Sequence, residues 1–202
     1  MYRLFETIKV VNGKLENIEY HNVRVNRSRW QLLHASAEWD LTQLIKLPEL
    51  NPEQVYKCRF VYDETPGIAE FTPYSIKPLR KLTLTKCEVI IYNHKFTDRS
   101  LLERLKQNNP QYDDVIIAQN GRITDLSYAN LVFWDGKSWI TPSTPLLNGT
   151  KRQQYLNAGS ILEREIKVLD LPHFEKLRII NAMIDLDESP DIFVKDINSY
   201  ID

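Results

Sequence analysis

The sequence predicts a protein of the mixed α/β (α+β) class, built from two small domains. Apolar, strand-like stretches recur along the chain, and several are joined by Asn-Gly or Asp-Gly pairs that are typical of hairpin turns. Stretches with helical spacing of apolar residues alternate with these strands. The chain has 202 residues, of which 43% are hydrophobic and 26% are charged. This composition is enough for a sizeable buried core.

Residues 1–90 are predicted to form an N-terminal α+β domain with an antiparallel sheet. Asn12-Gly13 tolerates the positive φ angles of a two-residue hairpin turn, and Thr65-Pro66-Gly67 marks a second turn. Apolar residues between Val23 and Ala37 recur at helical spacing. We therefore expect a helix at 21–39 and strands at 2–11, 14–20, 55–62, 68–76 and within 80–92.

Residues 91–202 are predicted to form a C-terminal α/β domain. Asn120-Gly121 and Asp135-Gly136 mark two hairpin turns. Pro110 lies beyond one predicted helix, and Gly159 ends another. We expect helices at 98–108, 149–158 and 172–177, and strands at 114–119, 122–134 with a polar interruption at 125–130, 138–141, 165–169 and 178–184.

Composition excludes several classes of function. The 6 glycines are not spaced as a dinucleotide-binding turn, a Walker-type phosphate loop or the G-x-S-x-G elbow of α/β-hydrolases. A net charge of -1 gives no global attraction to nucleic acid or to anionic membranes. The 4 histidines lack metal-ligand spacing, so we expect no metal site. The N-terminus carries charges that a signal peptide would not tolerate, so we expect a cytoplasmic protein with no membrane partner.

Lys95 is the strongest candidate for a nucleophilic amine. It lies between an apolar strand-like stretch and the start of a predicted helix. Partial desolvation and the positive end of the helix dipole both favour the neutral amine that Schiff-base formation needs. The alternative is a solvated surface lysine, as most lysines are.

A phosphate-binding helix start is predicted at residues 146–152. Gly149 and Thr150 open this helix, so its first backbone N–H groups are unpaired and point toward any bound anion. The alternative is an ordinary capped helix.

Two further polar residues need partners. Asp125 lies within a strand-like stretch, with Asn130 five residues on, and a carboxylate there is either a functional group or part of a locally satisfied turn or bulge. Arg24 lies on the first predicted helix. It either binds an anion or belongs to a solvated basic face with Arg27 and Arg29.

The order of these features resembles the class IV aminotransferases. This pyridoxal-phosphate family includes branched-chain aminotransferases, D-amino-acid aminotransferases and aminodeoxychorismate lyases. The resemblance runs from about Glu6 to about Leu186. In the first half of the chain, the matching stretches are Glu6-Thr7 with the hairpin after it, Tyr20-His21-x-x-Arg24-x-x-x-Ser28, which is similar to an H-x-x-R-L helix, and Lys95 before a leucine-rich helix. Residues 112–125 are similar to D-E-A-L … G-x-V-T-E, and Ala129-Asn130-Leu131-Val132-Phe133 is similar to S-N-V-F. Residues 141–152 are similar to T-P … L-L-P-G-I-T-R, and Ile180-Asn181-Ala182-Met183 is similar to a late N-S-L/M strand.

The resemblance implies a D-amino-acid-aminotransferase-like fold, with pyridoxal 5'-phosphate in the cleft between the two domains and most of its site in residues 91–202. It implies that Lys95 and Asp125 are catalytic, with Lys95 forming the Schiff base and Asp125 facing the pyridine nitrogen. The cofactor contacts that it implies are Arg24, Lys95, Asp125, Asn130, Gly149, Thr150, Lys151, Asn181 and Ala182. It also implies a homodimer that acts on a small, amino-acid-like substrate.

The sequence departs from the family pattern in three places, one of which is Leu126, where the family usually has a small residue. Asp125 stands where the family has a glutamate, which is one methylene longer. Thr150-Lys151-Arg152 replaces I-T-R, so either Thr150 or Lys151 takes the role of the family's threonine.

Two activities fit the resemblance, namely a pyruvate-releasing aminodeoxychorismate lyase and an amino-acid transaminase. The short chain favours the lyase. The alternatives are a non-catalytic cofactor-binding or interaction module with the same fold, and a generic α+β domain without cofactor.

Overall fold

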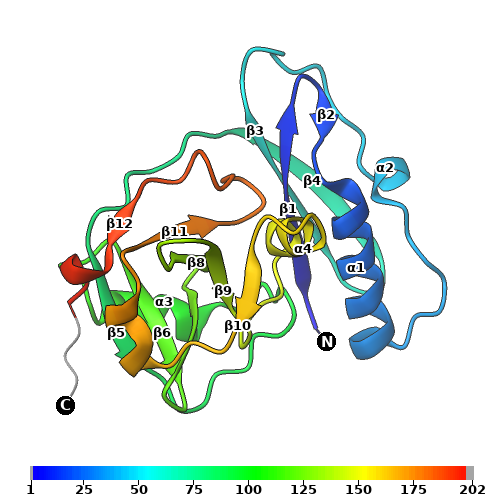
Figure 1. Cartoon of the computed structure of the whole chain (residues 1–202). Helices are drawn as coiled ribbons and strands as arrows, with labels where there is room; N and C mark the ends of the chain where they lie inside the picture. The colour runs from blue at the N-terminus through cyan, green and yellow to red at the C-terminus, as the bar shows by residue number, and fades with distance from the viewer. Residues whose placement is uncertain (1, 199–202) are drawn as a thin grey trace. The chain divides into compact units, whose positions relative to one another are not determined.

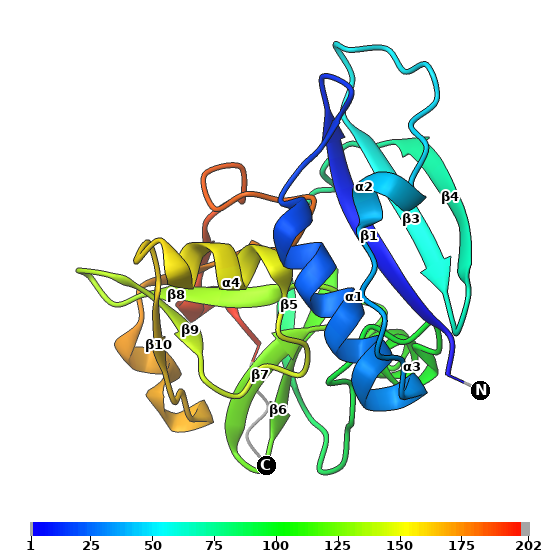
Figure 2. The same ribbon diagram turned by 90° about the vertical axis from the view of Figure 1, so that its right-hand side faces the viewer.

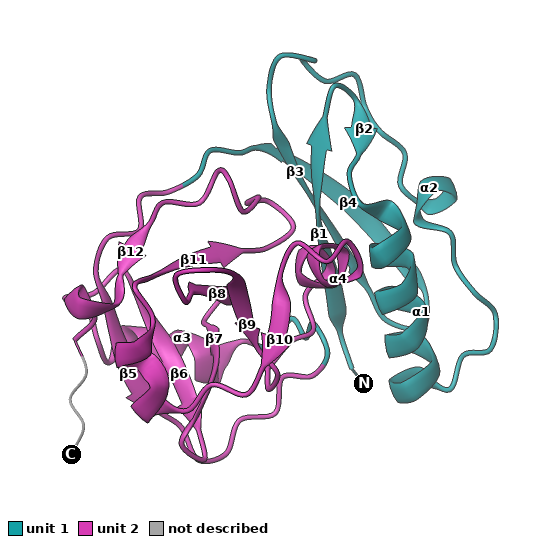
Figure 3. Cartoon of the chain, in the orientation of Figure 1, with its two compact units in different colours: residues 1–76, 94–98 teal, residues 77–93, 99–202 magenta. Residues whose placement is uncertain are grey.

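A computed structural model describes residues 2–198 and divides the chain into two compact units (Figures 1 and 3). Unit 1 comprises residues 1–76 and 94–98, and unit 2 comprises residues 77–93 and 99–202. The chain therefore leaves unit 1 after Ile76 and returns to it for a five-residue segment. The division into one domain of residues 1–90 and another of residues 91–202 stays a prediction.

Unit 1 combines a small antiparallel sheet with a long helix. Its elements are β1 (Leu4–Val11), β2 (Lys14–Leu15), α1 (Ile18–Leu33), α2 (Leu41–Leu44), β3 (Tyr56–Tyr62) and β4 (Pro66–Pro73). The strand expected at 14–20 is wrong beyond Leu15. Asn17 adopts a left-handed conformation with φ of 56°, which ends the strand and starts α1.

The sheet of unit 1 has the strand order β2-β1-β3-β4, and α1 lies along one of its faces (Figure 2). Side chains alternate between the two faces of a strand. Leu4, Ile8 and Val10 of β1 therefore join the core under α1. The buried members of this core are Leu4, Ile8, Val10, Val25, Leu41, Ile45, Cys58, Phe60 and Tyr62.

The second expected turn, Thr65-Pro66-Gly67, is wrong at its last two residues, because Pro66 and Gly67 already belong to β4. The pairing of β3 with β4 shifts by one residue between Phe60 and Tyr62. At this bulge the backbone of Gly67 approaches Val61 so closely that a Cβ on Gly67 would lie 2.2 Å from the Val61 carbonyl oxygen. Glycine is therefore needed for the close approach of the two strands.

A carboxylate sits within the apolar core face of β1. Glu6 is fully buried and accepts hydrogen bonds from Arg24 Nε at 2.9 Å, Arg24 Nη2 at 2.5 Å and His21 Nδ1 at 2.5 Å. Burial alone would raise the pKa of Glu6, but the charge of Arg24 and the bonds from His21 and Arg24 lower it to about 2. The ionised carboxylate thus joins β1 to the helix that covers it.

Unit 2 contains the remaining elements. They are β5 (Leu82–Lys86), α3 (Ser100–Gln107), β6 (Asp114–Gln119), β7 (Arg122–Leu126), β8 (Asn130–Trp134), β9 (Trp139–Pro142), α4 (Thr150–Asn157), β10 (Leu162–Arg164), η1 (Val168–His173), β11 (Lys176–Ile180), β12 (Ile192–Phe193) and η2 (Val194–Asp196). Both η elements are 3-10 helices.

The strand expected at 165–169 and the helix expected at 172–177 are wrong. The strand in this region, β10, ends at Arg164, and a 3-10 helix runs from Val168 to His173 instead. The Asp170 carboxylate accepts the backbone N–H of Lys167 at 2.8 Å, which caps this short helix. Phe174 is extended, so the chain enters β11 at Lys176.

Strand β8 is central to the sheet of unit 2. The strand order is β10-β9-β8-β7-β6-β5, and β11 also pairs with β8. The pairs β5–β6 and β9–β10 are parallel, and the others are antiparallel. Three of the five residues of β8 are fully buried, namely Leu131, Val132 and Phe133.

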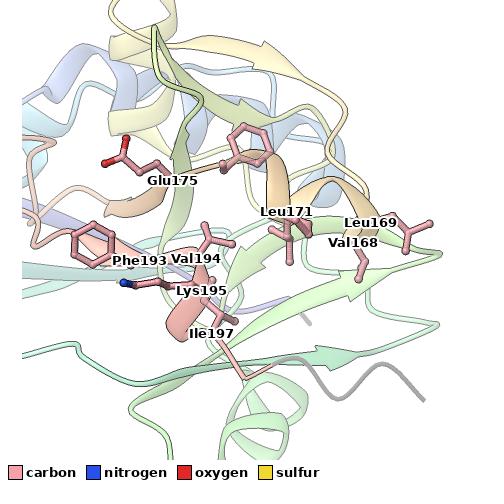
Figure 4. A pocket seen from close by; sticks show the side chains of 10 residues that line it. Val168, Leu169, Leu171, Glu175, Phe193, Val194, Lys195 and Ile197 are labelled. Atoms are coloured by element: carbon pink, nitrogen blue, oxygen red, sulfur yellow. The ribbon is translucent and has the colours of Figure 1, made fainter.

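An apolar pocket of about 700 Å³ lies near the end of the described chain. Figure 4 shows side chains of η1, including Val168 and Leu171, on one side, and Phe193, Val194 and Ile197 on the other. None of the residues that the sequence predicts for the site lines this pocket. Within residues 2–198, no helix is long and apolar enough to cross a membrane.

The Glu6 cluster generates a prediction about stability. The pKa of Glu6 is depressed in the folded state, so its contribution is present above pH 4.5 and is lost as the pH falls toward 2. We expect Glu6→Gln to lower the free energy of unfolding by about 3 kcal/mol at pH 7, and by much less at pH 3. Urea denaturation at the two pH values measures both differences.

Glu70→Gln is the matched control, because Glu70 is an exposed carboxylate on the same sheet. It should change the free energy of unfolding by no more than about 0.5 kcal/mol. A loss in Glu6→Gln that is equal at pH 7 and pH 3 would contradict the role of the ionised carboxylate.

Candidate active site

The predicted site residues divide between the two units. Arg24 and Lys95 belong to unit 1. Unit 2 contains Asp125, Asn130, Gly149, Thr150, Lys151, Asn181 and Ala182. The geometry of each group is described within its own unit.

Lys95 is positioned by β1 and lies outside any helix cap. The strand before it ends at Lys86 and α3 begins at Ser100, so the expectation that Lys95 directly links a strand to a helix is wrong. Instead, the backbone N–H of Phe5 donates to the Lys95 carbonyl at 3.0 Å, and a bridge pairs Leu4 with the residue after Lys95. The Lys95 Nζ lies 4.7 Å from the centroid of the Phe5 ring.

A second contact attaches the Lys95 segment to α1. Ser28 and His94 are both buried, and Ser28 Oγ lies 2.9 Å from His94 Nδ1. Burial, reinforced by the charge of Arg27, lowers the pKa of His94 and favours its neutral form. The segment that carries Lys95 is therefore held by β1 through its backbone and by α1 through the preceding side chain.

Arg24 faces the core through its two hydrogen bonds to Glu6. The solvated basic face that the sequence allowed for α1 is wrong. Arg29 is buried, donates from Nη1 to the Ala37 carbonyl at 2.5 Å, and lies 3.6 Å over the Trp39 ring. Arg27 is half-buried, and its Nε has no hydrogen-bond partner in the described part of the chain.

In unit 2, Asp125 is a buried carboxylate at the end of β7 that meets β8. Its Oδ1 accepts from Asn130 Nδ2 at 2.8 Å, and its Oδ2 accepts from the backbone N–H of Leu147 at 3.0 Å. Burial raises the pKa of Asp125 to about 6, against the lowering effect of these two bonds. The partner at residue 147 is remote in sequence, so the bonds of Asp125 are not those of a purely local turn.

Asn130 brings the other predicted residues of unit 2 to the same end of β8. It pairs in register with Asp125 on β7 and with Ile180 on β11. Asn181 and Ala182 follow Ile180 directly in a tight turn, in which Asn181 Oδ1 accepts the backbone N–H of Met183. The Asn130 Nδ2 also donates to the Leu147 carbonyl at 2.8 Å.

The start of α4 packs against Asn130. Gly149 precedes the helix in an extended conformation, and a Cβ on it would lie 2.0 Å from Asn130 Oδ1. Thr150 is the first helical residue and is buried. Lys151 is also buried, and its Nζ forms an ion pair with Asp185 at 2.5 Å. Thr150 and Lys151, the two candidates for the position of the family's threonine, therefore differ in their contacts, because the side chain of Lys151 is directed to the Asp185 carboxylate.

Sequence reasoning missed Arg152 as a residue of this site. Its buried guanidinium donates to the Pro142 carbonyl at 2.8 Å and to Asn148 Oδ1 at 3.1 Å, and its charge lowers the pKa of Asp125.

In unit 1, the sequence identifies Glu6 and His21 only as positions within motifs and does not predict that they are buried together. An alternating strand in which Glu6 shares a face with Leu4 and Ile8 is the signal that predicts a buried carboxylate with a cationic partner.

Comparison with known proteins agrees with these motifs. A family profile described as amino-transferase class IV matches residues 3–186. A Haemophilus influenzae protein whose function is not described is 40% identical over 185 residues, which cover 91% of this chain and 98% of that protein. A Schizosaccharomyces pombe protein named "Putative aminodeoxychorismate lyase" is 27% identical over 166 residues, which cover 77% of this chain and 62% of that protein.

Solved structures share the fold. The crystal structure of a Haemophilus somnus protein, described as a putative 4-amino-4-deoxychorismate lyase, matches with a TM-score of 0.82 and 34% identity over 91% of this chain and 97% of that one. An aminotransferase from Brucella abortus, bound to the cofactor PLP, matches with a TM-score of 0.73 and 15% identity over 94% of this chain and 80% of that one. The fold is therefore that of the pyridoxal-phosphate aminotransferases and lyases, and the chain belongs to the class IV aminotransferase family.

Proposed function

We propose that this chain is a pyridoxal-phosphate enzyme of the aminodeoxychorismate-lyase type, which releases pyruvate from an enol-pyruvyl ether. The observation that carries the proposal is the cluster at the end of β8, where a buried carboxylate, Asp125, lies beside the glycine-started helix α4. The proposal of a lyase is supported by the two relatives that are named as such. When bound, the cofactor supplies an electron sink for the carbanion that forms at the substrate.

The charge state of Asp125 fits a cationic ring nitrogen. Burial makes ionisation of this carboxyl unfavourable, so a cation placed beside it would stabilise the charged form. Asn130 and the Leu147 N–H hold the carboxylate in one orientation. We propose that Asp125 keeps the ring nitrogen protonated, and that Asn130 acts through Asp125.

The start of α4 fits a phosphate group. The first N–H groups of a helix have no intrahelical partners, and the macrodipole favours an anion there. We propose that the N–H groups of Gly149, Thr150 and Lys151 and the Thr150 hydroxyl bind the phosphate, with the turn at Asn181 and Ala182 beside them. Because Lys151 Nζ pairs with Asp185, Thr150 takes the role of the family's threonine.

Unit 1 supplies a guanidinium and an amine. Glu6 holds Arg24 by two hydrogen bonds and so fixes the plane of its guanidinium. We propose that Arg24 contacts the phosphate and that Lys95 holds the cofactor covalently, then removes the substrate's Cα proton. A homodimer, a cytoplasmic location and a small amino-acid-like substrate remain part of this proposal.

An amino-acid transaminase is the second candidate, because a Mesorhizobium loti protein described as a putative amino-acid aminotransferase shares the fold with a TM-score of 0.75 and 19% identity. The two activities differ in the product. Incubation of the cofactor-loaded enzyme with aminodeoxychorismate and a coupled pyruvate assay tests the lyase. Amino-group transfer from an amino acid to a 2-oxo acid, without pyruvate release from the ether, would favour the transaminase.

The proposed function makes three predictions, of which the first concerns the covalent bond to the cofactor. We expect borohydride reduction of the cofactor-loaded protein to label Lys95, because its amine lies beside the Phe5 ring on the segment held by β1. Lys95→Ala should lose the label and keep its circular dichroism spectrum. Peptide mapping identifies the labelled residue, and a label on Lys86 or Lys106 would refute the assignment.

The second prediction concerns the close approach of α4 to β8. Gly149→Ala should weaken cofactor binding at least about tenfold, because the new Cβ would displace Asn130 and with it the bonds to Asp125 and Leu147. Fluorescence titration with pyridoxal phosphate measures this affinity. Gly136→Ala is the control: its Cβ would meet nothing within 4 Å, and the strain of alanine at a φ of 92° would fall on a turn that contacts neither Asn130 nor α4. Equal affinities for the two variants would contradict the phosphate role of α4.

The third prediction concerns Asp125. Asp125→Asn should retain the cofactor but lose turnover on the order of 100-fold, because a neutral amide does not hold the ring nitrogen in its cationic form. Asp114→Asn removes another buried carboxyl, one that is bonded to Ser127, and should lower stability without the same loss of turnover. If Asp125→Asn turns over as fast as the parent, the electron-sink role is wrong.

A further inference from the structure

The start of α4 contains a buried lysine that the family pattern does not have. This chain has Thr150-Lys151-Arg152 in place of I-T-R. The side chain of Lys151 is only 6% exposed, and its Nζ lies 2.5 Å from Asp185 Oδ1. An ammonium buried to this extent needs an anionic partner, because desolvation disfavours its charged form. Asp185 supplies that partner, and since its own side chain is 25% exposed, solvent screens the pair weakly.

The same carboxylate oxygen accepts a second bond from α4. The Tyr155 hydroxyl donates to Asp185 Oδ1 at 3.2 Å and accepts the backbone N–H of Leu186 at 3.0 Å. Lys151 and Tyr155 are four residues apart, so they lie on the same face of the helix. One face of α4 is therefore tied to residues 185–186 by three contacts.

Residues 185–186 directly follow the turn that contains Asn181 and Ala182. Two backbone bonds close this turn, one from the Asn181 N–H to the Ile184 carbonyl at 3.2 Å and one from the Ile184 N–H to the Asn181 carbonyl at 3.1 Å. The strand before the turn, β11, is fixed by its pairing with β8. The contacts of Asp185 with α4 fix the other end, so the position of the turn relative to the helix depends on both.

We propose that Asp185 is a positioning residue of the phosphate site, which acts through the Lys151 ammonium and the Tyr155 hydroxyl to hold the 181–184 turn at the start of α4. Because the ammonium is engaged by Asp185, the Lys151 side chain is a tether between two segments and its amine is not a phosphate ligand. This inference rests on the proposed function, since the phosphate is placed there at the start of α4.

The experiment measures the affinity of the full chain for pyridoxal phosphate and for pyridoxal, which lacks the phosphate, by fluorescence titration. Asp185→Asn keeps the shape of the side chain and removes the charge that holds Lys151. It should weaken binding of pyridoxal phosphate about tenfold, as for the loss of a charge-assisted bond, and leave binding of pyridoxal unchanged. Lys151→Met should have the same effect. The double variant should bind as weakly as either single variant, because the two residues act as one unit.

Asp191→Asn is the matched control. Asp191 is a second carboxylate of unit 2 that accepts from two cations, Lys176 Nζ at 2.7 Å and Arg178 Nε at 2.6 Å. This variant should leave the affinities for both compounds unchanged. Tyr155→Phe removes a hydroxyl that bonds to Asp185 and should give a smaller loss in the same direction, which preserves the test if Asp185→Asn does not fold.

The outcomes separate this inference from the proposed function. If Lys151→Met weakens binding of pyridoxal phosphate while Asp185→Asn tightens it or leaves it unchanged, the amine itself contacts the phosphate and the inference is wrong. An equal loss of affinity for pyridoxal and pyridoxal phosphate in Asp185→Asn reflects general destabilisation and also overturns it. In both cases the parent still binds the cofactor, so the proposed function stands. A parent protein that binds no pyridoxal phosphate refutes the proposed function, and the inference falls with it.

Discussion

Asn130 contacts three separate segments of unit 2, two through its side-chain amide and one through its backbone. Its Nδ2 donates both to Asp125 on β7 and to the Leu147 carbonyl before α4, and its Oδ1 lies where only glycine fits at position 149. Its backbone pairs with Ile180, just before the turn at Asn181. An amide can do this because it carries donors and an acceptor on one rigid plane. Without that side chain, Asp125 would keep its bond from the Leu147 N–H but lose the bond to Oδ1, and the Leu147 carbonyl would lose its donor.

In unit 1, charged side chains join separate segments, namely Glu6 of β1 with Arg24 and His21 of α1. Glu6 takes a position that alternation assigns to the apolar core, and its ionised form survives there only because Arg24 and His21 supply three hydrogen bonds. Removing one partner of a buried ion pair is costly, but the intact pair contributes little net stability relative to an apolar replacement, since desolvation offsets the attraction. Their effect is directional, because the bidentate contact sets both the rotation of α1 over β1 and the plane of the Arg24 guanidinium.

Local signals in the sequence predicted the regular elements of the fold. The strand expected at 114–119 is β6 with the same bounds, and the Asn120-Gly121 turn has the positive φ angles that its composition predicts. The Leu-Asp-Leu-Pro stretch after residue 168 differs from the expected strand and helix, because a side-chain cap and a proline favour a 3-10 helix there. The neighbours of Lys95 also differ from the expected ones, because its segment pairs with β1, about ninety residues earlier, and no local pattern encodes that pairing.

The sequence predicts a candidate site residue only where that residue is part of a recognisable motif. Asp125, Asn130 and Gly149 are recognisable by their order along the chain, and the structure brings these three together. The roles of Glu6 and Arg152 depend on partners that are distant in sequence. For such residues the sequence predicts that a partner is needed, but it does not identify the partner.

The burial of Asp125 makes the stability of the folded chain depend on pH. In the unfolded chain this carboxyl ionises near the usual aspartate value of 3.8, whereas in the folded chain its pKa is about 6. As the pH rises through this interval, the unfolded state loses its proton first, so at neutral pH the free energy of unfolding of the empty protein is lower by on the order of 3 kcal/mol. Under the proposed function, a cationic ring nitrogen opposite Asp125 would offset that penalty, and binding would stabilise the folded state by mass action. Without such a cation, Asp125 makes the folded chain open more often at neutral pH than near pH 4.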